Sequence, residues 1–161
     1  MARSMTPKRR RALGIAPVLI ILGICAAAAF GSPGSGVGFT NLVAKADLDQ
    51  VRLNSDRVKF QTKGPTAVRF QTLKFQPGAR TGWHHHPGFT LVAVQDGEVT
   101  VIDSDCNATA YPAGSAFVEH GDEPLEVRNR GPEEATVYAT YVDPSASGPV
   151  WRLEDPVHNC P

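Results

Sequence analysis

The chain has 161 residues, of which 42% are hydrophobic, so we expect a single domain with a core and exclude wholesale disorder. Its 16 Lys and Arg residues balance its 16 Asp and Glu residues, but five of the cations lie within the first 11 residues, before any acid. The rest of the chain therefore has 11 basic and 16 acidic residues, and this acidic excess argues against nucleic acid as a partner.

Residues 1–30 have the pattern of a signal for export. Residues 1–11 are basic, and residues 12–30, ALGIAPVLIILGICAAAAF, carry no charge. Cations before an apolar run stay on the cytoplasmic side while the run enters the membrane. The pattern predicts a signal peptide cleaved near residues 26–29, or an uncleaved membrane anchor, because 19 apolar residues are just enough to span. A third reading, a buried helix of the domain, is disfavoured by the adjacent cations. In either of the first two cases the globular part is secreted or lies outside the inner membrane.

The chain after the export segment is expected to contain a linker, one domain and a tail. Residues 31–50 begin with GSPGSGVG, a composition that predicts a flexible linker. We expect the domain to occupy residues 51–145 and a C-terminal tail to occupy residues 146–161.

Short β-strands are predicted throughout the domain. Residues 95–97, Gln-Asp-Gly, separate two of them and predict a β-hairpin turn. Short strands with turn residues between them, and no helical periodicity after residue 50, predict an all-β antiparallel sandwich or barrel. The predicted strands are residues 68–75, 90–94, 98–102, 115–119, 125–129 and 135–142.

Three cysteines occur in the chain. Cys25 lies in the apolar export segment, and Cys106 and Cys160 lie in turn-like surroundings. In an oxidising compartment an even pair predicts a disulfide, which would fix the tail to a loop in the middle of the domain. The alternative is two unrelated thiols.

Three consecutive histidines, His84, His85 and His86, are the most informative feature of the chain. On an extended strand His84 and His86 point to one face and His85 points to the other. Two imidazoles on the inner face of a barrel can share one divalent cation such as Zn, Cu, Fe or Ni.

The spacing around these histidines resembles the first motif of the cupin superfamily, G-x5-H-x-H-x3–4-E-x6-G. Gly78, His84, His86 and Gly97 occupy four of its five landmarks, and Thr90 stands where the motif has Glu. The resemblance implies a small β-barrel of the jelly-roll kind, with its ligand pocket at the open mouth.

The second cupin motif, G-x5-P-x-G-x2-H-x3-N, is degenerate in this chain. When the motif is anchored on Gly114 and Asn129, Leu125 takes the place of the metal-binding His. An alternative register puts Phe117 there. The third His is missing in both registers. The resemblance covers residues 68–142.

Other residues could complete a metal site, because two imidazoles alone bind a cation weakly and protein sites normally use three or four ligands. Glu119, His120 and Glu123 lie near the expected position of the third ligand, and Glu119 is our candidate for it. Trp83 could form a wall of the pocket. Two alternatives stay open for the histidine pair: hydrogen bonds to an organic ligand without metal, or a place on the barrel rim without a function.

The first hypothesis for function is an exported cupin-type protein that binds a divalent metal or a small molecule inside its barrel, without strong catalysis. The second is a metal-dependent enzyme, a dioxygenase or isomerase, that uses His84, His86 and Glu119 as the two-His-one-carboxylate set of non-haem iron sites. The third is a surface domain with a filled barrel that only displays loops to partner proteins.

The sequence does not distinguish Zn, Fe, Mn, Ni and Cu, and it assigns no catalytic residue. A small-molecule ligand is expected, and membrane contact is expected only through residues 12–30 if they are not cleaved. The resemblance also implies a homodimer.

Overall fold

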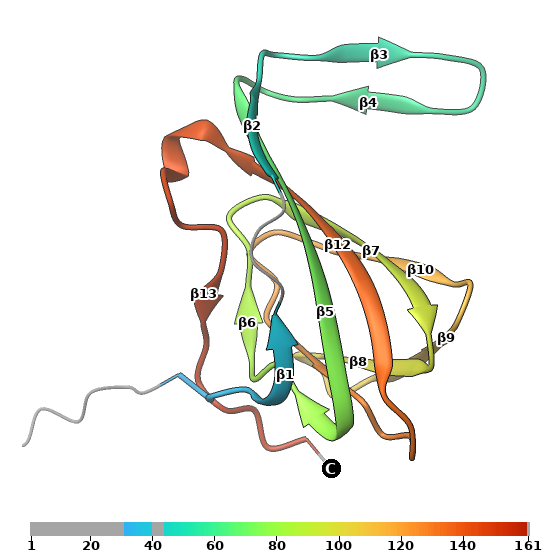
Figure 1. The fold of residues 1–161 in the computed structure, drawn as a ribbon. Helices are drawn as coiled ribbons and strands as arrows, with labels where there is room; N and C mark the ends of the chain where they lie inside the picture. The colour runs from blue at the N-terminus through green and yellow to red at the C-terminus, as the bar shows by residue number, and fades with distance from the viewer. Residues whose placement is uncertain (1–30, 40–43, 161) are drawn as a thin grey trace, which may run out of the picture.

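The computed structural model describes residues 31–39 and 44–160, which form a nearly closed antiparallel β-barrel (Figure 1). Within these residues the only helix is the 3-10 turn η1, Ser145–Ser147, so the all-β prediction is confirmed. No helix of the described residues is long and apolar enough to cross a membrane. The predicted export or anchor segment, residues 1–30, lies outside the described residues.

One layer of the barrel is built around the long strand β5. Strand β5 is paired with β12 along one edge and with β1 and β2 along the other, and β12 continues to β7 and then to β10. The strands of this layer are β1 (Ser35–Phe39), β2 (Ala44–Leu48), β5 (Thr66–Arg80), β7 (Phe89–Asp96), β10 (Ala116–Glu119) and β12 (Ala135–Pro144).

The second layer faces the first and carries the histidine motif. Strand β11 is its centre: it pairs with β8 and β6, and it joins the first layer at the end of β5. Strand β13, from the C-terminal tail, adds to the other edge of β6. The strands of this layer are β6 (His84–His85), β8 (Glu98–Asp103), β9 (Ala108–Pro112), β11 (Leu125–Arg128) and β13 (Leu153–Glu154).

Alternating side chains fill the space between the layers. In β5, Leu73, Phe75 and Ala79 are buried while Lys74 between them is exposed, as period-two alternation requires. The corresponding residues of the other strands complete the core, including Val92, Val94, Val99, Phe117, Leu125, Val127, Val137, Ala139 and Tyr141.

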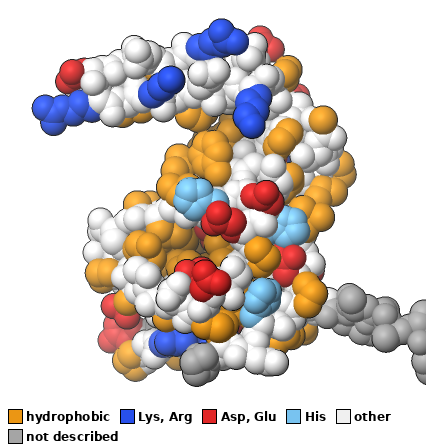
Figure 2. Space-filling view, turned by 180° about the vertical axis from the view of Figure 1, so that it is seen from behind, with side chains coloured by type: hydrophobic (Ala, Val, Ile, Leu, Met, Phe, Trp, Pro, Cys, Tyr) orange, Lys and Arg blue, Asp and Glu red, His pale blue; other side chains and the backbone are white. Residues whose placement is uncertain are grey.

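A two-stranded arm, β3 (Arg52–Asn54) and β4 (Lys59–Gln61), projects away from the barrel (Figure 1). Figure 2 shows Lys and Arg side chains along this arm. The exposed cations of residues 51–63 are Arg52, Arg57, Lys59 and Lys63.

The segment predicted as a flexible linker contributes two strands instead. Residues 35–39 and 44–48 of the expected linker pair with β5. The Gly-rich composition suggested flexibility, but without these partners one edge of the 15-residue strand β5 would present a row of unpaired backbone groups. The prediction of a linker is therefore wrong for these two stretches.

The predicted hairpin at residues 95–97 is also wrong. Strands β7 and β8 flank this turn as expected, but β7 pairs with β10 and β12, whereas β8 pairs with β9 and β11. The turn is a corner that leads the chain from one layer to the other. Gly97 is required there: its φ is +71°, and a Cβ would lie 2.8 Å from the Cα of Ala135.

The disulfide between Cys106 and Cys160 is present, with Cα atoms 5.2 Å apart. It joins the turn after β8 to the C-terminal tail. The tail is therefore held against the barrel, next to the strand that carries the histidines.

Candidate metal centre

Strand β6 and the residue directly after it direct two imidazoles into the barrel. The strand is held on both edges, since His84 is paired with Leu125 of β11 and with Glu154 of β13. His84 and His86 are each 2% exposed, whereas His85 between them is half-buried and its Nδ1 lies 2.7 Å from Asp155 Oδ2. The two faces follow from the alternation of an extended chain.

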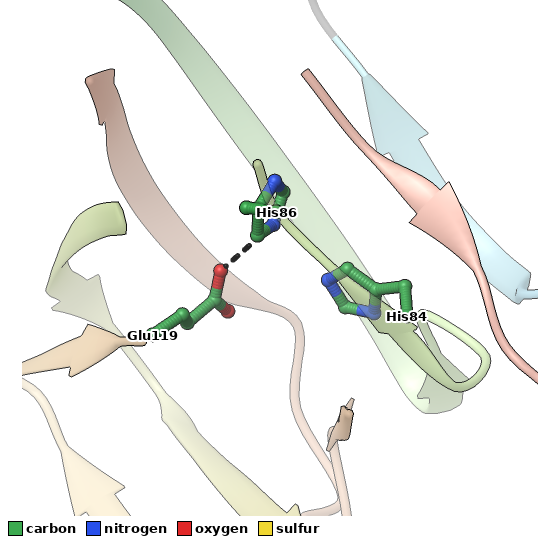
Figure 3. Close-up of side chains that lie close together, drawn as sticks. All are labelled: His84, His86 and Glu119. Carbon is green, nitrogen blue, oxygen red and sulfur yellow. Dashed lines mark ion pairs between the residues drawn. The ribbon is translucent and has the colours of Figure 1, made fainter. Parts of the chain in front are cut away.

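Glu119, the last residue of β10, brings a carboxylate to these rings. It is 5% exposed, and its Oε2 lies 3.1 Å from His86 Nε2. His84, His86 and Glu119 each offer a ligand atom, and the three atoms lie within 4.8 Å of one another. Figure 3 shows the three side chains pointing toward one another, with His84 on β6, His86 directly after it, and Glu119 on β10.

Backbone carbonyls fix which nitrogen of each ring is available. His84 Nδ1 donates to the carbonyl of Gly82 at 2.9 Å, and His86 Nδ1 donates to the carbonyl of Trp151. A carbonyl only accepts hydrogen bonds, so both Nδ1 atoms carry hydrogen and both Nε2 atoms are left for other partners. This is the arrangement that orients a metal-binding imidazole.

The short distance between His86 Nε2 and the Glu119 carboxylate requires a positive charge between the two atoms. With hydrogen on Nδ1, a neutral His86 presents a lone pair at Nε2, and this lone pair would face a carboxylate oxygen at 3.1 Å. Two acceptors repel each other unless a proton or a metal cation lies between them. The donor set therefore fits a cation.

Protonation states at neutral pH also fit metal binding. Burial lowers the pKa of His84 from 6.5 to about 4, so this ring stays neutral. Burial alone would raise the pKa of Glu119, but in the metal-free protein a hydrogen bond from a protonated His86 and the charges of His86 and Arg152 outweigh it and lower that pKa. Metal ligands must be deprotonated, and both residues are.

Thr90, which stands at the Glu position of the cupin motif, lies beside the three residues. It is paired with Glu119 on one side and with Tyr141 on the other, so its side chain shares their face. Its hydroxyl is buried and has no hydrogen-bond partner among the described residues. A buried hydroxyl without a partner is costly, and a hydrated cation in this centre would supply one.

A cavity of about 210 Å³ adjoins the three residues. Its polar edge includes Tyr141, whose hydroxyl donates to Gln71 Oε1 at 2.9 Å. Burial, and then the charge of Glu119, raise the pKa of Tyr141, so this hydroxyl keeps its proton. The rest of the wall is mostly apolar: Phe39, Leu73, Phe75, Val92, Phe117, Val127, Val137, Ala139 and Trp151. The cavity contradicts the hypothesis of a filled barrel.

The C-terminal tail supplies two residues that the sequence did not reveal. We call residues 151–155 the strap. Trp151 and Arg152 of the strap line the cavity, and Arg152 Nη2 donates to the carbonyl of Thr81 at 2.7 Å. The strap lies outside the cupin motifs, and only the predicted disulfide placed the tail on the barrel.

Three residues predicted as additional pocket or ligand residues do not line the cavity. His120 and Glu123 are exposed in the turn after β10. Trp83 is buried, but alternation turns it away from the cavity, and its ring stacks on His158 with centroids 4.4 Å apart. Leu125, at the place of the third cupin His, is a buried core residue.

Comparison with known proteins gives the family and little more. No curated protein sequence matches the chain. Solved structures that are similar include a conserved protein of unknown function from Streptococcus pyogenes, at 18% identity and a TM-score of 0.44, with 48% of this chain and 65% of that chain covered. A conserved protein with a double-stranded β-helix domain from Klebsiella pneumoniae is 20% identical with a TM-score of 0.48, and 56% of this chain and 76% of that chain are covered. A sugar phosphate isomerase of a cupin superfamily from Silicibacter pomeroyi is 22% identical with a TM-score of 0.41, and 45% of this chain and 48% of that chain are covered.

The family follows from the sequence match and agrees with the barrel described above. Residues 71–141 match the family model of the cupin domain, Cupin_2. This stretch runs from β5 through the histidine motif to β12, and it contains His84, His86 and Glu119. Residues 71–141 of the chain are therefore identified as a cupin domain.

Proposed function

We propose that this cupin binds one divalent transition-metal ion through His84, His86 and Glu119. The observation that carries the proposal is the commitment of both Nδ1 atoms to backbone carbonyls, which leaves two Nε2 atoms beside a buried carboxylate. Two imidazoles and one carboxylate suit Fe, Mn, Zn, Ni and Cu, so the donor set alone does not select the metal.

The centre is suited to binding a small molecule beside the metal. Three protein ligands leave coordination positions open, and the adjoining cavity gives a ligand access to them. We propose that the main task of the protein is such binding, without strong catalysis.

A metal-dependent enzyme is the second candidate, favoured by the set of two His and one carboxylate next to a cavity. This set with open positions is typical of non-haem iron oxygenases. A cation held there would supply Lewis-acid chemistry, and redox chemistry if it is iron. Oxygen uptake by the iron-loaded protein with candidate substrates distinguishes the two: turnover that Glu119→Gln abolishes favours the enzyme.

The metal content of protein purified without a His-tag tests the proposal. We expect close to one transition-metal ion per chain in wild type, and a large loss in His84→Ala/His86→Ala and in Glu119→Gln. His120→Ala is the matched control, because this imidazole is exposed and lies outside the centre. Low metal content in wild type that does not change in these variants would remove the metal proposal.

We also propose that the protein is exported and acts outside the inner membrane. The basic and apolar pattern of residues 1–30 supports this, and so does the disulfide, since disulfides persist in oxidising compartments. Cell fractionation with N-terminal sequencing tests it: a mature chain that begins near residue 30 indicates cleavage, and an intact chain in the membrane fraction indicates an anchor. Recovery from the cytosol would contradict export.

The homodimer implied by the resemblance stays a prediction. Four large apolar side chains on β5, β7, β10 and β12 are between 45% and 49% exposed: Phe70, Leu91, Val118 and Tyr138. A face of this kind fits burial against a second copy. Light scattering on the purified protein checks it, with Tyr138→Lys expected to shift a dimer toward monomer.

A further inference from the structure

Arg152 is a fixed cation at the edge of the cavity. Its Nε lies 2.6 Å from Glu154 Oε1, and its Nη2 donates to Thr81 O at 2.7 Å and to Glu154 Oε2 at 3.1 Å. Its side chain is 22% exposed. These bonds hold the guanidinium, while its Nη1 makes no hydrogen bond with the described residues. The guanidinium of Arg152 therefore has N–H donors at Nη1 that a ligand can use.

Arg152 also lies where an outer groove adjoins the cavity. The groove lies between β1 and the strap, and Phe39, Thr81 and Arg152 line both the groove and the cavity. Arg80 is a second guanidinium in the groove, and Glu154, the carboxylate partner of Arg152, also lines it, so the groove holds two cations and one anion. Cations along a recessed path attract anions, and the planar guanidinium matches a carboxylate with two parallel hydrogen bonds.

The charges around the centre leave room for one negative charge. The charge of Arg152 is offset by its partner Glu154, and Glu119 offsets half of the charge of a divalent cation. The metal-loaded centre therefore has a net charge of about +1 by formal counting. A monoanion would neutralise it.

The cavity selects for size and polarity. Its volume of about 210 Å³ lies below the ~300–1,000 Å³ of pockets for drug-sized molecules. Away from its polar edge the wall is apolar, including Leu73, Phe75, Val92, Phe117 and Val137, and these side chains cannot pair with a hydroxyl group. A sugar or a phosphorylated ligand would leave buried polar groups unpaired, whereas an apolar body would not.

We propose that the ligand of this barrel is a small apolar monocarboxylic acid, which Arg152 recognises. Its carboxylate lies between the guanidinium and the metal centre, and its apolar body lies in the cavity. The metal contact rests on the proposed function, but the contact with Arg152 does not.

Paired acids and amides of the same shape test the proposal. Benzoate with benzamide, and hexanoate with hexanamide, are titrated by calorimetry into the full chain, both metal-free and zinc-loaded. We expect at least one acid to bind ~10-fold or more tightly than its amide, because hydrogen bonds between charged groups are the strong ones. Arg152→Gln should remove this preference and leave the affinity for the amide unchanged.

Two further variants separate the effect of the Arg152 charge from the effect of its planar shape and from that of a surface charge elsewhere. Arg152→Lys keeps the charge without the planar fork and should retain part of the preference. Arg57→Gln removes an exposed cation on the projecting arm, and it should leave the affinities unchanged. The zinc affinity of Arg152→Gln, measured in the same samples, reports whether the metal centre is intact.

The outcomes distinguish this inference from the metal proposal. If acids bind with dependence on Arg152 but zinc does not bind, the metal proposal fails and the inference stands. If zinc binds normally and no acid is preferred over its amide, or Arg152→Gln leaves the preference intact, the inference is overturned.

Discussion

Glu119 of β10 lies directly opposite Thr90 of β7 in the antiparallel ladder of the barrel. Thr90 stands where the cupin motif has its carboxylate, so the chain carries a carboxylate on the neighbouring strand instead. Side chains directly opposite each other share a face, with Cβ atoms ~4.5–5.5 Å apart. With its carboxylate at position 119 instead of position 90, the chain still has a carboxylate beside His86.

Moving the carboxylate back should restore a metal site. Glu119→Thr removes one of three ligands and should weaken zinc binding by ~100-fold or more, a larger loss than is typical for the partners that only orient a ligand. Thr90→Glu in addition should recover much of the affinity. Competition with a chromogenic chelator measures both. A double variant that binds as weakly as the single one would show that position 90 does not reach the centre.

Acid should destabilise the metal-free protein through His84. The pKa of this ring is about 4 in the folded chain, because of burial, against 6.5 ordinarily. Between these values the unfolded chain binds a proton that the folded chain does not. The contribution of the neutral His84 ring to the free energy of unfolding is therefore fully present above pH 6.5. It is lost as the pH falls toward 4, by up to about 3 kcal/mol.

Urea unfolding in EDTA at several pH values measures this effect. His84→Gln should show a smaller loss of stability between pH 6.5 and 4 than wild type, because glutamine does not titrate. Equal losses in the two proteins would mean that His84 is not the buried neutral ring described here.

Removing one partner of the buried ion pair between Arg69 and Asp143 should destabilise the protein more than replacing both. Arg69 Nη1 lies 2.5 Å from Asp143 Oδ2, and the two side chains are 2% and 0% exposed. Arg69→Met leaves an unpaired buried carboxylate and should reduce the free energy of unfolding by ~3–5 kcal/mol. Arg69→Met/Asp143→Leu should recover most of it. A single variant as stable as wild type in urea would contradict this role.

The disulfide should support the metal centre through the strap. Cys106→Ala/Cys160→Ala frees the tail whose Trp151 carbonyl accepts the hydrogen bond of His86. We expect zinc affinity to fall by ~10-fold, as for other losses of a partner that orients a ligand, and stability to fall by ~2–5 kcal/mol. Reduction of the wild type should have the same effect. Unchanged zinc affinity in the variant would show that the strap holds without the disulfide.

The sequence predicted the elements that depend on local pattern. The period-two alternation of residues 68–75 lies within β5, and the inward direction of His84 and His86 follows from the same rule. The disulfide followed from an even pair of cysteines. Glu119 was named as a candidate ligand, and the structure places it beside both imidazoles.

Elements that depend on distant partners were not predictable in the same way. The Asp96-Gly97 turn has the local signal of a hairpin, but the partners of β7 and β8 are set by the closure of the barrel. Strands β1 and β2 form because β5 offers an edge. Arg152 reaches the cavity only because the tail pairs with β6, and no local pattern of residues 146–161 shows this.

Anomalous diffraction at the metal absorption edge, from crystals of the metal-loaded protein, tests the central claim most directly. The account predicts one peak about 2.0–2.2 Å from His84 Nε2, His86 Nε2 and a carboxylate oxygen of Glu119. A peak at His120 and Glu123 instead, or no peak beside the two imidazoles at saturating metal, would contradict it.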